Sequence, residues 1–319
     1  MGFISELFGY VLNALYNLIN NYGVAILIFS ILLRLILIPI TIKQQKSMKK
    51  NNKLQQEMKI LQVKYKNNPE QLNKETMELY KREGISPFSG CLSAILQIII
   101  ILSVFWLVSQ PLTYMKKVQN TDIYNEYKTK IEEDSNTKST YKEISIINAV
   151  ENDYKEIIRK LEDGEYVENS EETQVNTEST ENTETFETKE YLENRKNELE
   201  QLRLNMEFLT LDLSKVPTNN LNDWKVYIIP VLYVITSFIS IKMSTKVQTS
   251  KEGELSEQEA SMQQMNKSMS YMMPIMSISI AAIAPLGLAL YWLVSNILMI
   301  IERLFIDKIM SSKEENENV

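Results

Sequence analysis

One apolar run near the N-terminus, residues 24–42, holds nineteen residues of which only Arg34 is charged. A helix of that length rises about 1.5 Å per residue and spans roughly 28 Å, close to the thickness of a bilayer's hydrocarbon core. An arginine near the middle of such a helix costs at least about 2.5 kcal/mol. We therefore predict a transmembrane helix over residues 22–42 in a protein that must accommodate this charge.

Four further apolar runs extend this prediction to an all-α integral membrane protein with five transmembrane helices. These runs cover residues 91–112, 224–242, 269–284 and 286–304. The last two come from one stretch that is almost free of charge and that Pro285 divides near its middle. Because that stretch is too long for one untilted helix and proline interrupts a helix, two short transmembrane helices fit it better.

The segments between the runs predict two helical elements outside the hydrocarbon core. Residues 1–21 repeat apolar side chains at steps of three and four, which is typical of an amphipathic helix in the membrane interface. Residues 43–86 show a similar period, broken near Pro69, and predict a helical hairpin. Residues 43–84 carry eleven lysine and arginine residues against five acidic ones. Because such basic loops stay in the cytoplasm, we expect the N-terminus to lie outside.

The longest polar segment, residues 113–223, is strongly acidic. It carries 14 basic and 26 acidic residues. We expect helical structure between residues 123 and 161, and disorder between residues 164 and 188, where Glu, Thr, Asn and Ser dominate. Five transmembrane helices would place this segment outside and would place the loop 243–268 and the tail 305–319 in the cytoplasm.

Composition excludes several classes of chemistry. The chain has no histidine, one cysteine, Cys91, and no glycine-rich phosphate-binding motif. Histidine-ligated metals, histidine general bases and internal disulfides are therefore excluded. We expect no enzyme activity, no cofactor, no metal site and no specific recognition of nucleic acid.

The surroundings of Arg34 bear most directly on function, and the sequence leaves three of them open. Glu302, near the cytoplasmic end of the last run, is the only acidic residue in the other runs and could form an ion pair with Arg34. The guanidinium could instead extend to lipid headgroups. We favour a water-filled cavity inside the helix bundle, which Ser30, one turn earlier, would help to line.

The basic hairpin also has two possible roles. It offers many basic and amphipathic side chains, among them Lys59, Tyr65 and Tyr80, which would suit a docking arm for a ribosome, a partner protein or an emerging chain. It could equally be a solvated basic cap on the bundle.

Five motifs resemble the YidC family of membrane protein insertases, which is related to the Oxa-type insertases of organelles. They are LLRLILIPIT, MKILQVKYKNNPEQLNKETMELYKREGISPFSGCL, FLTLDLSK, MSYMMPIM and GLALYWLVSN. The resemblance covers about two-thirds of the chain in the same order, whereas residues 116–205 have no counterpart in the compact family members.

This resemblance implies a hydrophilic groove among the five helices, open to the cytoplasm and to lipid and closed on the outside. Such a groove would receive the hydrophilic part of a nascent membrane protein at a bacterial plasma membrane, without ATP. The ribosome and the Sec translocon are further candidate partners. The residues expected to contact the substrate are Arg34, Ser30, Gln97, Tyr233, Tyr291 and Asn296.

Two other functions are compatible with the same residues. An anion channel or transporter would place Arg34 in its pore, although we find no repeated halves of the kind that such proteins often contain. A structural scaffold would use an ion pair between Arg34 and Glu302 to lock the helices together.

Overall fold

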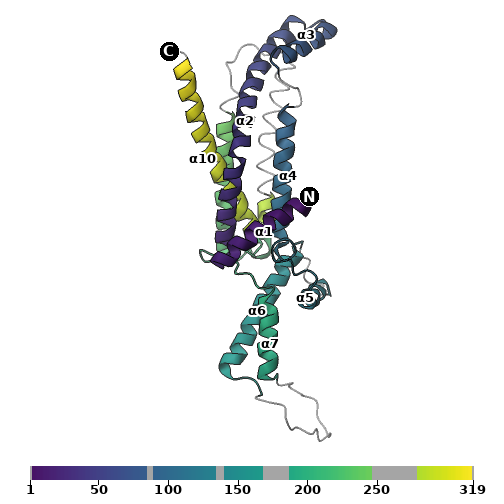
Figure 1. Cartoon of the computed structure of the whole chain (residues 1–319), viewed down its shortest axis with the longest axis vertical. Helices are drawn as coiled ribbons and strands as arrows, with labels where there is room; N and C mark the ends of the chain where they lie inside the picture. Colours follow the sequence, from purple (N-terminus) through teal and green to yellow (C-terminus); the bar gives the residue numbers. More distant parts are fainter. Residues whose placement is uncertain (1, 85–88, 134–139, 168–186, 246–278, 318–319) are drawn as a thin grey trace. The chain divides into compact units, whose positions relative to one another are not determined.

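The computed structural model describes residues 2–84, 89–133, 140–167, 187–245 and 279–317 (Figure 1). Nearly all of its regular structure is helical. The chain divides into two compact units. Unit 1 contains Ile26–Val104 and Val216–Val319, and unit 2 contains Gly2–Ala25 and Phe105–Lys215.

Three helical segments of the described residues are long and apolar enough to cross a membrane. They are Tyr22–Ser47, Trp224–Met243 and Leu286–Ile306. Many apolar side chains on these segments, such as Leu35 and Ile36, are exposed in the isolated chain. Because water would not favour so much exposed apolar surface on a helix, these side chains form the surface that faces lipid.

The other two predicted transmembrane helices are not among these three segments. Helix α4, Ser89–Ser109, has a shorter apolar section over Ile95–Ser109. Residues 269–278 of the predicted fourth helix lie outside the described residues. Residues 279–283 are helical, and the helix is interrupted at Ala284 and Pro285. This break lies where the sequence pattern places the boundary between the last two transmembrane helices.

Helix α2, Tyr22–Lys64, continues without interruption from the first membrane segment into the basic hairpin. Pro39 lies inside it. Helix α3, Pro69–Arg82, then folds back beside the end of α2 (Figure 1). Asn68 caps α3 by accepting a hydrogen bond from the backbone N–H of Gln71, and proline suits the first helical position because its missing N–H leaves no donor unsatisfied there.

The remaining elements of unit 1 lie after residue 216. Two short 3-10 turns, η2 (Pro217–Asn219) and η3 (Trp224–Tyr227), lead into α8, Ile228–Thr245. Helix α10, Leu286–Glu317, packs along α8. Helix α10 therefore continues well beyond the predicted membrane boundary at residue 304.

Unit 2 begins with α1, Gly2–Ile19, which packs against the π-helical turn η1, Leu112–Lys116. The buried side of α1 consists of Ser5, Gly9, Leu12 and Tyr16, of which the first two are small. By contrast, Leu7, Val11 and Leu18, three of the apolar residues that recur along residues 1–21, are exposed and form an apolar stripe. The interfacial position predicted for this helix would bring such an exposed apolar stripe into contact with lipid and stays a prediction.

Three further helices of unit 2 build a small hydrophilic bundle. They are α5 (Asp122–Glu133), α6 (Lys142–Asp163) and α7 (Lys189–Glu200), and α6 packs against both of the others. Ile146, Ile147, Leu192 and Leu199 are fully buried. Helices α5 and α6 cover the region expected to be helical, whereas α7 was not predicted. Residues 168–186, which include most of the segment predicted to be disordered, lie outside the described residues.

Unit 2 ends in a short antiparallel hairpin, which the sequence analysis did not predict. Strands β1 (Glu207–Phe208) and β2 (Leu211–Asp212) pair Glu207 with Asp212 and Phe208 with Leu211. Residues Leu209 and Thr210 form the turn between them.

A buried carboxylate, Glu143 at the start of α6, fastens η1 to the helical bundle of unit 2. Glu143 Oε2 accepts hydrogen bonds from the backbone N–H groups of Leu112 at 2.7 Å and Thr113 at 3.1 Å. Its Oε1 accepts from the hydroxyls of Thr113 and Tyr124. Burial raises the pKa of Glu143, and these donated hydrogen bonds oppose the shift.

We expect Glu143→Ala to destabilise unit 2 by about 3 kcal/mol, because it leaves several buried donors without an acceptor. Thermal unfolding of the purified protein, with hydrogen exchange to localise the change, measures this effect. Glu143→Gln is the control, since it keeps one carbonyl acceptor and should cost less than half as much. Equal stability of the alanine variant and the natural protein would contradict the role given to Glu143.

Candidate functional site

Arg34 lies on α2 inside the first membrane segment and contacts α10 at two points. Its Nη1 lies 3.3 Å from Glu302 Oε2, and its Nη2 donates a hydrogen bond to the backbone carbonyl of Ser295, also at 3.3 Å. Residues 295 and 302 share one face of α10, because seven residues make almost two helical turns. Arg34 therefore bridges α2 to one face of α10, and the ion pair left open by the sequence is present.

This ion pair is shielded but incompletely satisfied. The side chain of Arg34 is 19% exposed and that of Glu302 is 9% exposed. Glu302 Oε1 is buried and has no hydrogen-bond partner among the described residues. The contact is thus a single long interaction rather than the paired, bidentate geometry that arginine and carboxylate can form. Both side chains retain hydrogen-bonding capacity for a further polar group.

The other predicted residues near Arg34 are buried. Ser30 is one turn earlier on α2, and its hydroxyl donates to the backbone carbonyl of Ile26 at 2.7 Å. Tyr291 is buried on α10, one turn before Ser295. Their positions put two further hydroxyl groups on the helices that Arg34 joins.

A second polar group links α10 to α8. The side-chain amide of Asn296 is buried and donates hydrogen bonds to the hydroxyls of Thr236 and Ser237, each at 3.1 Å. Sequence reasoning singled out Asn296 but missed both hydroxyl partners. The feature that could have indicated them is that Thr236 and Ser237 are adjacent polar residues inside the apolar run 224–242. Such contacts stabilise neighbouring helices in lipid, where an unpaired amide would be costly.

The side chains of the remaining two predicted groove residues take no part in these two polar contacts, although the backbone carbonyl of Tyr233 accepts a hydrogen bond from the Thr236 hydroxyl at 2.9 Å. Tyr233 on α8 is half-buried, and its ring centre lies 6.0 Å from that of Trp292 on α10. Gln97 is exposed on α4. The structure therefore gathers Arg34, Glu302 and Ser295 in one contact and Asn296, Thr236 and Ser237 in another. The predicted groove stays a prediction, because most of the run predicted to form the fourth transmembrane helix lies outside the described residues.

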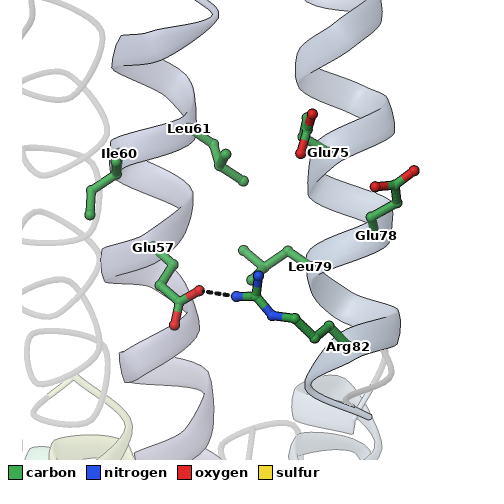
Figure 2. Close-up of a pocket in the computed structure, with 7 residues that line it drawn as sticks. All are labelled: Glu57, Ile60, Leu61, Glu75, Glu78, Leu79 and Arg82. Carbon is green, nitrogen blue, oxygen red and sulfur yellow. Dashed lines mark hydrogen bonds and ion pairs between the residues drawn. The ribbon is translucent and has the colours of Figure 1, made fainter.

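The basic hairpin contains a pocket of about 400 Å³ between α2 and α3 (Figure 2). Ile60, Leu61 and Leu79 supply its apolar surface. Arg82 reaches across from α3 and forms an ion pair with Glu57 on α2 at 2.5 Å. The two remaining lining residues are the carboxylates Glu75 and Glu78. The lining of this pocket therefore holds three carboxylates and one guanidinium, an excess of acid in an otherwise basic hairpin.

The tyrosines predicted to serve docking lie in contacts between the two hairpin helices. Tyr65 donates a hydrogen bond to Glu75 at 3.3 Å, and the hydroxyl of Tyr80 lies 3.6 Å from the sulfur of Met58. Ile60 and Val63 on α2 are instead largely exposed. The side chain of the third predicted docking residue, Lys59, lies outside the described part of the structure.

Among the described residues, no group of three or more histidine, cysteine, aspartate or glutamate side chains is placed to hold a metal ion. The arrangement consists of ionic and hydrogen-bonding groups held between apolar helices. These features define a multi-pass, all-α membrane protein with a charged pair and a polar amide inside its membrane region.

The chain belongs to the family described as 60Kd inner membrane protein, whose model matches residues 14–158 and 190–314. It is similar to proteins named "Membrane protein insertase YidC" from Francisella tularensis subsp. novicida (strain U112) and from Francisella tularensis subsp. holarctica (strain LVS). Each is 40% identical over 108 residues, which is 34% of this chain and 20% of the relative. The aligned part thus spans a fifth of the length of these relatives. The family predicted from the sequence motifs is confirmed at this level.

Proposed function

We propose that this protein inserts small membrane proteins into a bacterial plasma membrane and helps them to fold. Family membership and the insertase names of its relatives support the proposal. The single structural observation that carries it is Arg34, a charged side chain inside a membrane segment whose partner Glu302 keeps one carboxylate oxygen without a hydrogen bond among the described residues. Charged residues at this depth usually serve a function, because apolar residues would stabilise the helix better.

Insertion of a small client can proceed without ATP. Twenty apolar residues entering lipid contribute about −6 to −12 kcal/mol, whereas each charged residue crossing the centre costs about 2.5 to 3.5 kcal/mol. A hydrated groove shortens the apolar path for the client's hydrophilic part. The net free energy then favours clients with one or two transmembrane helices and short polar tails.

In this mechanism Arg34 attracts an acidic side chain of the client, and Glu302 is its counter-ion when no client is bound. The client carboxylate exchanges with Glu302 at the guanidinium, whose remaining N–H donors allow both contacts during the exchange. Ser30 and Tyr291 offer hydroxyls nearby, Asn296 contributes its amide, and Tyr233 and Gln97 contact the sliding client. The N-terminus lies outside and the C-terminus in the cytoplasm, so the groove opens toward the side of synthesis.

A reconstitution experiment tests the proposed function. The purified protein in liposomes should render a small one-span membrane protein resistant to added protease, without ATP, at a rate well above that of empty liposomes. The same liposomes should show no protein-dependent chloride flux. Chloride flux without insertion would contradict the proposal and favour an anion channel that uses Arg34 in its pore.

The hairpin is proposed to recruit partners through its exposed apolar residues. We expect the double variant Ile60→Gln/Val63→Gln to lower the insertion rate about fivefold, which corresponds to roughly 1 kcal/mol of lost contact. The measurement is the same protection assay, with circular dichroism to verify that the helices are retained.

Tyr65→Phe is the matched control for this prediction. It removes the hydrogen bond to Glu75 between the hairpin helices but leaves the exposed apolar surface unchanged. Its insertion rate should stay within twofold of the natural protein. A larger loss in Tyr65→Phe than in the double variant would show that hairpin rigidity, rather than partner contact, governs the rate.

A further inference from the structure

The turn of the β-hairpin in unit 2 has a costly backbone conformation. Leu209 and Thr210 join β1 to β2, and their φ angles are 48° and 65°. Two-residue hairpin turns often require positive φ at both positions, and asparagine followed by glycine usually fills them. Leucine and the β-branched threonine adopt this region only against steric repulsion from their Cβ atoms. A sequence selected only for an easy turn would not contain them.

The strained turn presents a large apolar side chain. Leu209 is 78% exposed, whereas its neighbour Leu211 is buried. Phe208 packs against the first turn of α2, since a Cβ added at Gly23 would lie 2.6 Å from Phe208 side-chain atoms. The hairpin is therefore seated firmly, and Leu209 is held away from the protein. Exposure to water would give a leucine in this position no advantage.

Hydrogen bonds fasten this hairpin to the end of a membrane segment. The backbone N–H of Tyr22 donates to the carbonyl of Asn205 at 2.9 Å. The side chain of Asn21 donates to the carbonyl of Glu207 at 2.7 Å, and the side chain of Asn205 donates to the carbonyl of Asn20 at 2.9 Å. Tyr22 is the first residue of the candidate segment Tyr22–Ser47.

The lipid boundary therefore passes close to the hairpin. The adjoining end of α1 carries Leu18, which is also highly exposed. The outer pair of the hairpin, Glu207 with Asp212, is polar, the apolar Leu211 of the inner pair is buried, and Leu209 at the tip is apolar and exposed. An apolar tip on a polar base suits the boundary between headgroups and acyl chains.

We propose that Leu209 inserts into the lipid leaflet at the α1–α2 end of the first membrane segment, and that the hairpin is a lipid anchor for unit 2. Its partner is the acyl-chain region of a phospholipid bilayer. The backbone strain is tolerated because it aims the leucine at lipid. This role does not depend on the insertase function.

Nitroxide accessibility tests the anchor in the full chain. Cys91→Ser removes the only thiol, and Leu209→Cys then carries a nitroxide in nanodiscs of phosphatidylethanolamine and phosphatidylglycerol. We expect collisions with oxygen to exceed those with a water-soluble nickel complex at position 209. A nitroxide at Tyr191→Cys, an exposed position on the hydrophilic helix α7, should show the reverse. Equal, water-like accessibility at both positions would overturn the proposal.

Hydrogen exchange in the same nanodiscs provides a second test, through Leu209→Asn. Asparagine tolerates positive φ better than leucine, so a purely structural turn would exchange its amides at the same rate or more slowly in this variant. Loss of an apolar side chain from lipid should instead accelerate exchange in residues 205–213 about fivefold. Unchanged or slower exchange would overturn the lipid anchor, whether or not the protein inserts clients.

Discussion

Arg34→Ala is expected to reduce the insertion of clients with acidic tails at least tenfold, while Arg34→Lys keeps most of the activity. A positive charge within the membrane region offsets part of the cost of about 2.5 to 3.5 kcal/mol for each client charge, and 1.4 kcal/mol corresponds to a factor of ten. Lysine preserves the charge but not the planar donor arrangement of arginine. Protease protection of a one-span client in proteoliposomes measures the change.

Substitutions of Glu302 distinguish a role of Arg34 in binding clients from a purely structural role. Because Arg34 pairs with Glu302, Arg34→Ala alone also leaves a shielded carboxylate without its partner, which typically costs about 3 to 5 kcal/mol of stability. We expect Arg34→Ala/Glu302→Gln to regain thermal stability but not insertion, and Glu302→Gln alone to retain insertion. Recovery of insertion in the double variant would identify the pair as a scaffold and refute the groove mechanism.

The membrane segments could be predicted from the sequence because the bilayer imposes a length and a hydropathy on each of them. The segments Tyr22–Ser47, Trp224–Met243 and Leu286–Ile306 all overlap predicted ones. The interruption at Pro285 could be predicted as well, since proline acts on the local backbone. Each of these features depends on residues that are close in sequence.

Helix ends were predicted less well because hydropathy and helicity change at different places. Around residue 42 the side chains turn from apolar to basic, but lysine, glutamine, glutamate and methionine are good helix formers. Helix α2 therefore continues to Lys64, just before Asn67, Asn68 and Pro69 interrupt it. The hydropathy boundary marks the surface of the membrane and not the end of the helix.

The candidate site could be predicted only in part because its contacts join distant residues. Arg34 and Glu302 are 268 positions apart, and their pairing depends on how α2 packs against α10. From the sequence, Glu302 could be identified as a possible partner of Arg34, but an ion pair with Glu302 could not be distinguished from a hydrated guanidinium. Asn296 has Thr236 and Ser237 as its hydrogen-bond partners. These contacts depend in the same way on how α8 packs against α10.

The β-hairpin escaped prediction for a different reason. Short turns are recognised by glycine, asparagine, aspartate or proline, and none of these occupies its two turn positions. Leu209 and Thr210 look like parts of a continuous strand instead. Their conformation is imposed by the hydrogen bonds and packing that seat the hairpin on the first residues of α2.

Gly9→Ala is expected to destabilise the attachment of α1 by about 3 kcal/mol, a large effect for one methyl group. A Cβ at Gly9 would lie 1.9 Å from the backbone oxygen of Tyr114 and 2.7 Å from its carbonyl carbon. Backbone atoms of η1 cannot move aside as the end of a flexible side chain can. The variant must therefore separate α1 from η1, which hydrogen exchange should reveal as loss of protection in residues 5–16.

Gly2→Ala is the matched control, since a Cβ at that position would meet no atom within 4 Å beyond its own chain neighbours and helix backbone. It makes the same chemical change in the same helix and should leave exchange and thermal unfolding unaltered. The contrast assigns any loss in Gly9→Ala to the close approach of α1 and η1 rather than to helix propensity, because alanine favours a helix more than glycine does. Similar stability of the two variants would mean that α1 does not rest on η1 at Gly9.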